Sequence, residues 1–100
     1  MTKATSRPFD SADYIDTPEA VAAYLEAALE DGDAQIIAAT LGDIARSKGM
    51  ATIAERTGLA REALYKSLSA DGNPRLTTLL GVLKATGLRL SVTTDSHQAA

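Results

Sequence analysis

The stretch from Met50 to Leu68 constrains the fold more than any other part of the chain, because two short helical patterns flank a turn of three residues. A small side chain, Ala54, stands where the two helices would cross, and Gly58 follows where the turn needs a positive φ. Three apolar side chains are spaced to fix the angle between the helices: Ile53, Leu59 and Leu64. This spacing predicts a helix-turn-helix, with a generic helical hairpin as the alternative.

A helix-turn-helix places the first turns of its second helix against base edges in the major groove of DNA. The predicted base-contacting side chains lie on that helix: Arg61, Glu62, Tyr65, Lys66 and Ser69. Cations at neighbouring helix ends are predicted to contact backbone phosphates, which position a protein without reading sequence: Arg46, Lys48 and Arg75. For Tyr65 the alternative is a partly buried ring, and for each cation it is a solvated charge.

The charge of the chain is split along its sequence. The net charge of −3 argues against a DNA partner, since duplex DNA is a dense line of phosphates. However, residues 1–45 carry nine acidic and two basic side chains, a net charge of −7, whereas residues 46–94 carry eight basic and three acidic ones, a net charge of +5. Such asymmetry is a hint of nucleic-acid contact on the basic half, but on charge alone solvated faces without a partner are the preferred interpretation.

Helix start and stop signals predict an all-α chain of five helices. Thr17-Pro18 is a strong start, because Thr can accept a hydrogen bond from a free amide and Pro is tolerated at the first helical position. The run Asp71-Gly72-Asn73-Pro74 predicts a loop. The expected helices are 18 to about 31, about 34 to 47, 50–57, 61 to about 69, and about 76 to 86. Apolar spacing predicts that Leu29 and Leu80 face inward.

The last predicted element is a short C-terminal β-strand. Residues 88–94 alternate apolar and polar side chains, which is the period of a strand, and Leu88, Leu90 and Val92 share one face. A lone strand cannot satisfy its own hydrogen-bonding groups. The strand either pairs with its copy in a homodimer, which is the preferred interpretation, or rests on a protein partner.

Length and composition predict one domain. A chain of 100 residues with 45% hydrophobic residues has room for a single core. We expect a disordered segment at 1–8, a folded domain at 9–94 and a flexible tail at 95–100. The sequence lacks Cys, and no signal peptide or membrane span is recognised, so we expect a cytoplasmic protein with no membrane partner.

The sequence offers little for catalysis. The single histidine, His97, lies in the predicted tail, so neither a His general base nor a multi-His metal site can be assembled. The glycines act as helix stops and do not form a phosphate-binding loop. We therefore expect a protein that is not an enzyme and holds neither a metal nor a cofactor.

An ordered series of motifs resembles a known family. The motifs run along residues 9–92: Phe9-Asp10, Tyr24-Leu25-Glu26-Ala27-Ala28-Leu29, Leu41-Gly42-Asp43-Ile44-Ala45-Arg46, Lys48-Gly49-Met50, Gly58-Leu59, Leu64-Tyr65-Lys66, Asp71-Gly72-Asn73-Pro74 and Gly87-Leu88. In these motifs the chain is similar to the addiction-module antidote proteins, HigA-like antitoxins with a Cro/repressor-type helix-turn-helix. The resemblance implies a five-helix, lambda-repressor-like domain.

The resemblance also implies two activities. One is neutralisation of a RelE/ParE-like toxin by direct binding, and the other is repression of the protein's own operon as a homodimer on operator DNA. Because such toxins are small basic proteins, an acidic helical surface suits them. The candidate toxin-binding residues, for which a solubilising face is the alternative, are Asp13, Asp16, Glu19, Glu26, Glu30 and Asp31. The rival functions are a stand-alone transcriptional regulator without a toxin and a protein-interaction adaptor that has lost DNA binding.

Some positions depart from these patterns. Ala60 replaces the Ser or Thr that often caps the recognition helix, which is expected to cost on the order of 1 kcal/mol of local stability. Ala51-Thr52 replaces a polar pair that ends in Gln, so a DNA contact from there is not expected. Thr57 and Ser67 stand where larger apolar groups are usual, and Leu68 is placed to take over the packing.

Overall fold

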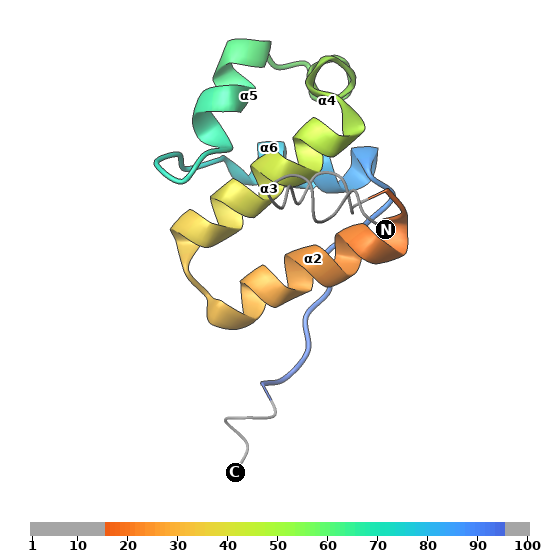
Figure 1. Cartoon of the computed structure of the whole chain (residues 1–100), viewed down its shortest axis with the longest axis vertical. Coiled ribbons are helices and arrows are strands. Elements are labelled where there is room, and N and C mark those ends of the chain that lie inside the picture. Colours follow the sequence, from red (N-terminus) through yellow and green to blue (C-terminus); the bar gives the residue numbers. More distant parts are fainter. Residues whose placement is uncertain (1–15, 96–100) are drawn as a thin grey trace, which may run out of the picture.

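The computed structural model describes residues 16–95, and their regular secondary structure is all helical. The helices are α2 (Pro18–Asp31), α3 (Ala34–Lys48), α4 (Met50–Thr57), α5 (Arg61–Ser67) and α6 (Leu76–Ala85). In Figure 1, α2 lies at the lower side of the molecule and α4 and α5 at its upper end, with α3 and α6 between them. The five predicted helices are therefore confirmed. The predicted disordered segment at 1–8 and residues 96–100 of the predicted tail lie outside the described residues.

The first described helix begins and ends, and the second begins, at the residues that the sequence signals predict. The Thr17 hydroxyl accepts a hydrogen bond from the Ala20 amide at 3.1 Å, and the Asp33 carboxylate accepts one from the Gln35 amide at 2.9 Å. Gly32 separates the two helices with a φ of 74°, in the left-handed region. Local side-chain chemistry thus sets the bounds of α2 and the start of α3.

The pair α4 and α5 has the connection that a helix-turn-helix requires. Gly58 takes a φ of 76°, and its amide donates to the Ala54 carbonyl at 2.9 Å. The chain therefore leaves α4 through a backbone conformation that residues with a Cβ rarely adopt. Ile53 and Leu64 are fully buried, as predicted, but Leu59 is 36% exposed. Its predicted packing role is wrong, because it sits in the turn beyond Gly58; Leu68, 2% exposed, completes the wedge instead.

Three helix ends differ slightly from prediction, and one is that of α3, which continues to Lys48 instead of ending at residue 47. The helix expected to reach about residue 69 ends at Ser67, because Leu68 leaves the helical conformation with a ψ of 51° while its side chain turns into the core. The last helix ends at Ala85, one residue before the expected end. All three differences lie within a turn, where packing rather than local sequence decides the last helical residue.

One core joins all five helices. Its largest fully buried side chains are Leu41, Ile44, Ile53, Leu64, Leu68, Val82 and Leu83. Two predicted inward residues are instead at the surface, since Leu29 is 47% exposed and Leu80 is 43% exposed. Each lies at the edge of the apolar stripe of its own helix, and this stripe is wider than the area that the neighbouring elements cover.

A close backbone approach fixes the position of α5 against α3. A Cβ added at Gly42, in the middle of α3, would lie 2.1 Å from the carbonyl oxygen of Leu68. No side chain fits this gap, because the obstructing atom belongs to the backbone. Gly42 therefore lets the end of α5 rest directly on α3.

The predicted C-terminal strand is wrong for the described chain, because residues 88–95 have no regular secondary structure. The Leu88 amide donates to the Leu83 carbonyl at 2.8 Å, but no backbone hydrogen bond joins residues 89–94 to the other described residues. Leu88 is half-buried, Leu90 is 44% exposed and Val92 is 96% exposed. Alternation alone does not make a strand, since the ladder needs a neighbouring extended chain and the helices supply none.

None of the helices in the described part of the chain combines the length and the apolar character needed to cross a membrane.

Candidate nucleic-acid interface

The outer face of α5 presents four of the predicted base-contacting side chains. Arg61, Glu62, Tyr65 and Lys66 are all exposed, and Tyr65 is 47% exposed. Residues four apart on a helix share a face, so Arg61 lies beside Tyr65 and Glu62 beside Lys66. Leu64 faces the other way into the core, which fixes the rotation of the helix. The geometry gives α5 one buried face and one outward polar face.

Ser69, the fifth predicted base contact, is separated from the other four. It lies beyond the end of α5, and it is half-buried. Its hydroxyl donates to the Lys66 carbonyl at 3.0 Å, which closes the turn after the helix. The hydroxyl thus already has a partner within the domain.

Lys48 and Arg75, two of the predicted phosphate contacts, are exposed at helix ends. Lys48 is the last residue of α3, and Arg75 immediately precedes α6 at its N-cap. Neither position is buried against another element. Both side chains are therefore accessible to a ligand beside the domain.

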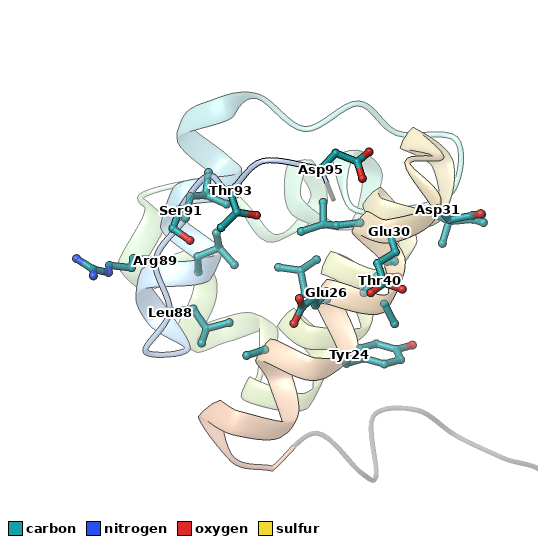
Figure 2. Close-up of a pocket in the computed structure, with 18 of the residues that line it drawn as sticks. Tyr24, Glu26, Glu30, Asp31, Thr40, Leu88, Arg89, Ser91, Thr93 and Asp95 are labelled. Carbon is teal, nitrogen blue, oxygen red and sulfur yellow. The ribbon is translucent and has the colours of Figure 1, made fainter. Parts of the chain in front are cut away.

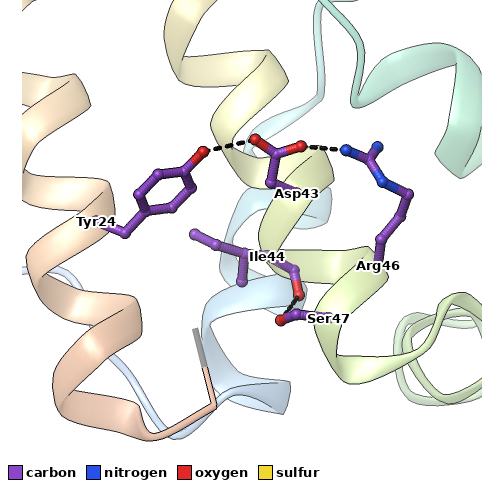
Figure 3. Close-up of polar contacts among 5 residues, drawn as sticks. All are labelled: Tyr24, Asp43, Ile44, Arg46 and Ser47. Atoms are coloured by element: carbon purple, nitrogen blue, oxygen red, sulfur yellow. Dashed lines mark hydrogen bonds and ion pairs between the residues drawn. The ribbon is translucent and has the colours of Figure 1, made fainter. Parts of the chain in front are cut away.

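Arg46, the third predicted phosphate contact, is held by an ion pair. Its guanidinium contacts the carboxylate of Asp43, one turn earlier on α3, and the other oxygen of that carboxylate accepts a hydrogen bond from the Tyr24 hydroxyl at 2.6 Å. Figure 3 shows the carboxylate between the phenol on one side and the guanidinium on the other. Because Tyr24 belongs to α2, the three residues tie α2 to α3 with charge-assisted hydrogen bonds. The positive charge of Arg46 is therefore partly neutralised by an ion pair within the domain.

A cation that the sequence analysis missed stands next to the turn. Arg56 is exposed in the last turn of α4, two residues before Gly58. A basic residue just before the glycine of a predicted helix-turn-helix is the signal that could have found it. Arg56 adds a positive charge at the end of α4 that leads into α5.

The candidate toxin-binding acids fall into two groups, one towards each end of α2. Asp16 and Glu19 are exposed at its N-terminal end, whereas Glu26, Glu30 and Asp31 are exposed in its C-terminal half. Glu19 and Glu30 are about 16 Å apart along the axis, at 1.5 Å per residue. Asp13, the sixth candidate, lies outside the described residues. One small contact cannot include both groups.

In Figure 1, the acidic helix α2 and the helix pair α4–α5 lie at opposite sides of the molecule. Within residues 16–95, no three His, Cys, Asp or Glu side chains are grouped so that they could hold a metal ion. The outer face of α5 and its neighbouring cations are suited to contacts with a polyanion, and the α2 side is suited to contacts with a cation.

Comparison with known proteins agrees with the resemblance. The family described as "Probable addiction module antidote protein" matches residues 5–94. An uncharacterized protein of Haemophilus influenzae is 40% identical over 86 residues, which cover 86% of this chain and 89% of that relative. No solved structure matches the chain. Because the family match spans nearly all of the sequence, the chain belongs to the family of probable addiction module antidote proteins.

Proposed function

We propose that the protein is the antitoxin of a type II toxin–antitoxin module, which neutralises a RelE/ParE-like toxin by direct binding and represses its own operon by binding operator DNA. The observation that carries the proposal is the family membership, and the helix pair α4–α5, whose second helix exposes Arg61 and Lys66, supports it. The protein works by binding rather than by catalysis, and it acts in the cytoplasm beside its operon.

In the DNA-binding activity, α5 enters the major groove. Arg61 donates two hydrogen bonds to a guanine, Glu62 accepts one from a cytosine, and Lys66 contacts a guanine or a phosphate. Tyr65 packs on a thymine methyl group or donates its hydroxyl to a phosphate. Cations around the helix contact the backbone and hold the register: Lys48, Arg56 and Arg75.

The operator is palindromic and the repressor is a homodimer. Two-fold symmetry places two copies of α5 in successive major grooves on one side of the duplex, so the half-sites are about 10 base pairs apart. Contact with two half-sites joins two weak interactions into one specific complex.

Operator binding is tested with the DNA fragment upstream of the gene. We expect Arg61→Ala and Lys66→Ala each to weaken binding by about 10-fold to 100-fold, which is the usual contribution of a direct base contact. Arg61→Ala also relaxes base preference. Arg89→Ala is the matched control, because it removes an exposed cation on the α2 side of the domain. Unchanged affinity in both α5 variants would contradict the assignment of α5 as the recognition helix.

Toxin neutralisation is tested by co-expression with the reading frame that adjoins this gene. We expect the neighbouring protein alone to stop growth, and co-expression of the antitoxin to restore it and to yield a co-purifying complex. Operator binding without any growth rescue would point instead to a stand-alone regulator. Rescue without operator binding would leave an antitoxin that does not repress.

A further inference from the structure

An open groove of about 1270 Å³ separates α2 from the segment that follows α6. One wall is the C-terminal half of α2 with the start of α3, and the other is the segment 88–95. Figure 2 shows Glu26 and Glu30 on the first wall, and Leu88, Ser91 and Thr93 on the second. Its two walls, α2 and the segment that follows α6, lie on the side of the domain away from α5 (Figure 1).

Three large apolar side chains are exposed in the groove. Leu29, Ile36 and Leu90 line it, and they are 47%, 43% and 44% exposed. They come from three different elements, so no single helix face explains them. Large apolar groups gathered in a concave surface mark a binding site more often than scattered ones do.

The second wall also offers main-chain groups. Residues 89–94 make no backbone hydrogen bond with the other described residues, so nothing in the described part of the chain pairs with their amides and carbonyls as a neighbouring strand would. A protein segment that lies along such a chain gains affinity from main-chain hydrogen bonds and specificity from alternate side chains. This favours an extended polypeptide as the occupant over a compact small molecule.

The charge of the groove selects the kind of polypeptide. Glu26, Glu30 and Asp31 line the α2 wall, and Arg89 lies opposite. A nucleic acid would be repelled by this excess of carboxylates. A second copy of the chain is also disfavoured, because a symmetric pairing through this groove brings two acidic walls together. A basic polypeptide with apolar side chains would bring cations to the carboxylates of the α2 wall. It would also cover the exposed leucines and isoleucine with apolar groups.

We infer that this groove is the docking site for the toxin, which is a basic protein that lays an extended segment along residues 89–94. The inference rests on the proposed antitoxin function and names the surface that performs it. Apolar side chains of the toxin contact Leu29, Ile36 and Leu90, and its cations pair with Glu26 and Glu30. Asp16 and Glu19, at the other end of α2, lie outside the contact.

The charge arm of the test compares two double variants of equal net charge. We measure the Kd of each full-length variant for the co-purified product of the adjoining reading frame, at low and high salt. Glu26→Gln/Glu30→Gln is expected to weaken binding by about tenfold at low salt, with a smaller difference at high salt. Asp16→Asn/Glu19→Gln, the control, is expected to bind within about twofold of the wild type. If both double variants weaken binding equally, only the net charge of the protein affects toxin affinity, and the inference that the toxin binds in this groove is wrong.

The apolar arm compares two exposed leucines. Leu90→Ser removes a groove side chain, whereas Leu76→Ser removes one that is 63% exposed at the start of α6. We expect Leu90→Ser to weaken toxin binding by about tenfold at both salt concentrations, and Leu76→Ser to leave it unchanged. Since both residues are at the surface, both variants are expected to fold, and circular dichroism checks this.

The outcomes separate this inference from the proposed function. If the wild type rescues growth and binds the toxin while the groove variants bind as tightly, the antitoxin function stands and the groove is overturned. If the wild type neither rescues growth nor binds the neighbouring protein, both fail. If Leu90→Ser converts a dimer into a monomer in light scattering and leaves toxin affinity unchanged, the groove is an interface between copies and the inference is wrong.

Discussion

The helix pair α2–α3 and the helix pair α4–α5 are held in different ways. Both helices of the first pair have a side chain at the N-cap, Thr17 or Asp33, that accepts a hydrogen bond from a backbone amide. Neither helix of the second pair has one, since Gly49 and Ala60 occupy those positions. The first pair has 14 and 15 residues, and the second has 8 and 7.

This difference shows what each pair depends on. Isolated helices of 7 or 8 residues are unstable in water, so α4 and α5 exist because Ile53, Leu64 and Leu68 are buried in the common core. The longer helices have local signals of their own, and the hydrogen bond from Tyr24 to Asp43 adds a link between them. A loss of core packing should therefore affect the proposed DNA-reading helix before it affects α2.

The two regions also differ in charge, but less simply than the sequence indicates. The basic half of the chain begins at Arg46, yet this residue is paired with Asp43, and Arg89 lines the groove beside the acidic residues of α2. Two of the eight cations counted in residues 46–94 are therefore placed away from α5 or already engaged. The positive surface around α5 is smaller than the net charge of the segment implies.

The largest expected effect is a loss of stability when a substitution disrupts the backbone contact between α3 and the end of α5. Gly42→Ala should gain about 1 kcal/mol of helix propensity but lose about 3 kcal/mol or more, because its Cβ meets the Leu68 carbonyl. Thermal unfolding should show a Tm lower by about 10 °C or more. The comparison variant is Gly81→Ala, which should lose less stability, because its Cβ would press on the side chain of Thr57, and a side chain can shift where a backbone carbonyl cannot. Equal stability of the two variants would contradict the close approach.

The second effect concerns the link between α2 and α3. Tyr24→Phe removes the hydroxyl that donates to Asp43 and should lower the free energy of unfolding by about 1.5 kcal/mol. Tyr65→Phe, on the exposed face of α5, should leave stability unchanged. Urea denaturation measures both. If Tyr24→Phe is as stable as the wild type, the α2–α3 pair does not depend on this hydrogen bond.

The third, smaller effect concerns the N-caps: one variant adds a cap to α5, and the other removes the cap of α2. Ala60→Ser supplies α5 with the missing cap, and should stabilise the protein by about 1 kcal/mol, because residue 60 already has the extended backbone of an N-cap with a ψ of 147°. Thr17→Ala removes the cap of α2 and should cost a similar amount, about 1 kcal/mol. Thermal unfolding of the two variants compares the helix starts directly. No gain from Ala60→Ser would mean that packing, and not capping, limits α5.

The smallest effect separates free cations from paired ones. Lys48→Ala should reduce the slope of log affinity against log salt for operator DNA by about one unit, because it removes a phosphate contact. Arg46→Ala should leave that slope nearly unchanged, since its guanidinium is paired with Asp43. A full unit of change from Arg46→Ala would show that Arg46 leaves Asp43 to bind phosphate.

Much of the fold could be predicted from local patterns. Thr17, Gly32 and Gly58 mark helix boundaries through hydrogen bonding and φ alone, and these effects act within a few residues. The exposed face of α5 followed from its helical period once Leu64 was taken as buried. The exposure of Leu29 could not be predicted, because it depends on which surfaces other elements cover. The groove was missed for the same reason, since its walls are far apart in sequence.

The sequence by itself determined where the helices lie, that α4 and α5 are joined by a tight turn, and which side chains α5 presents outward, because each depends on contacts within one or two helical turns. Only the tertiary structure decided that Arg46 is paired through Asp43 to Tyr24, that Gly42 touches the end of α5, and that residues 88–95 form one wall of an acidic groove and not a strand. These features arise between elements distant in sequence, where the packing of the core sets which groups meet.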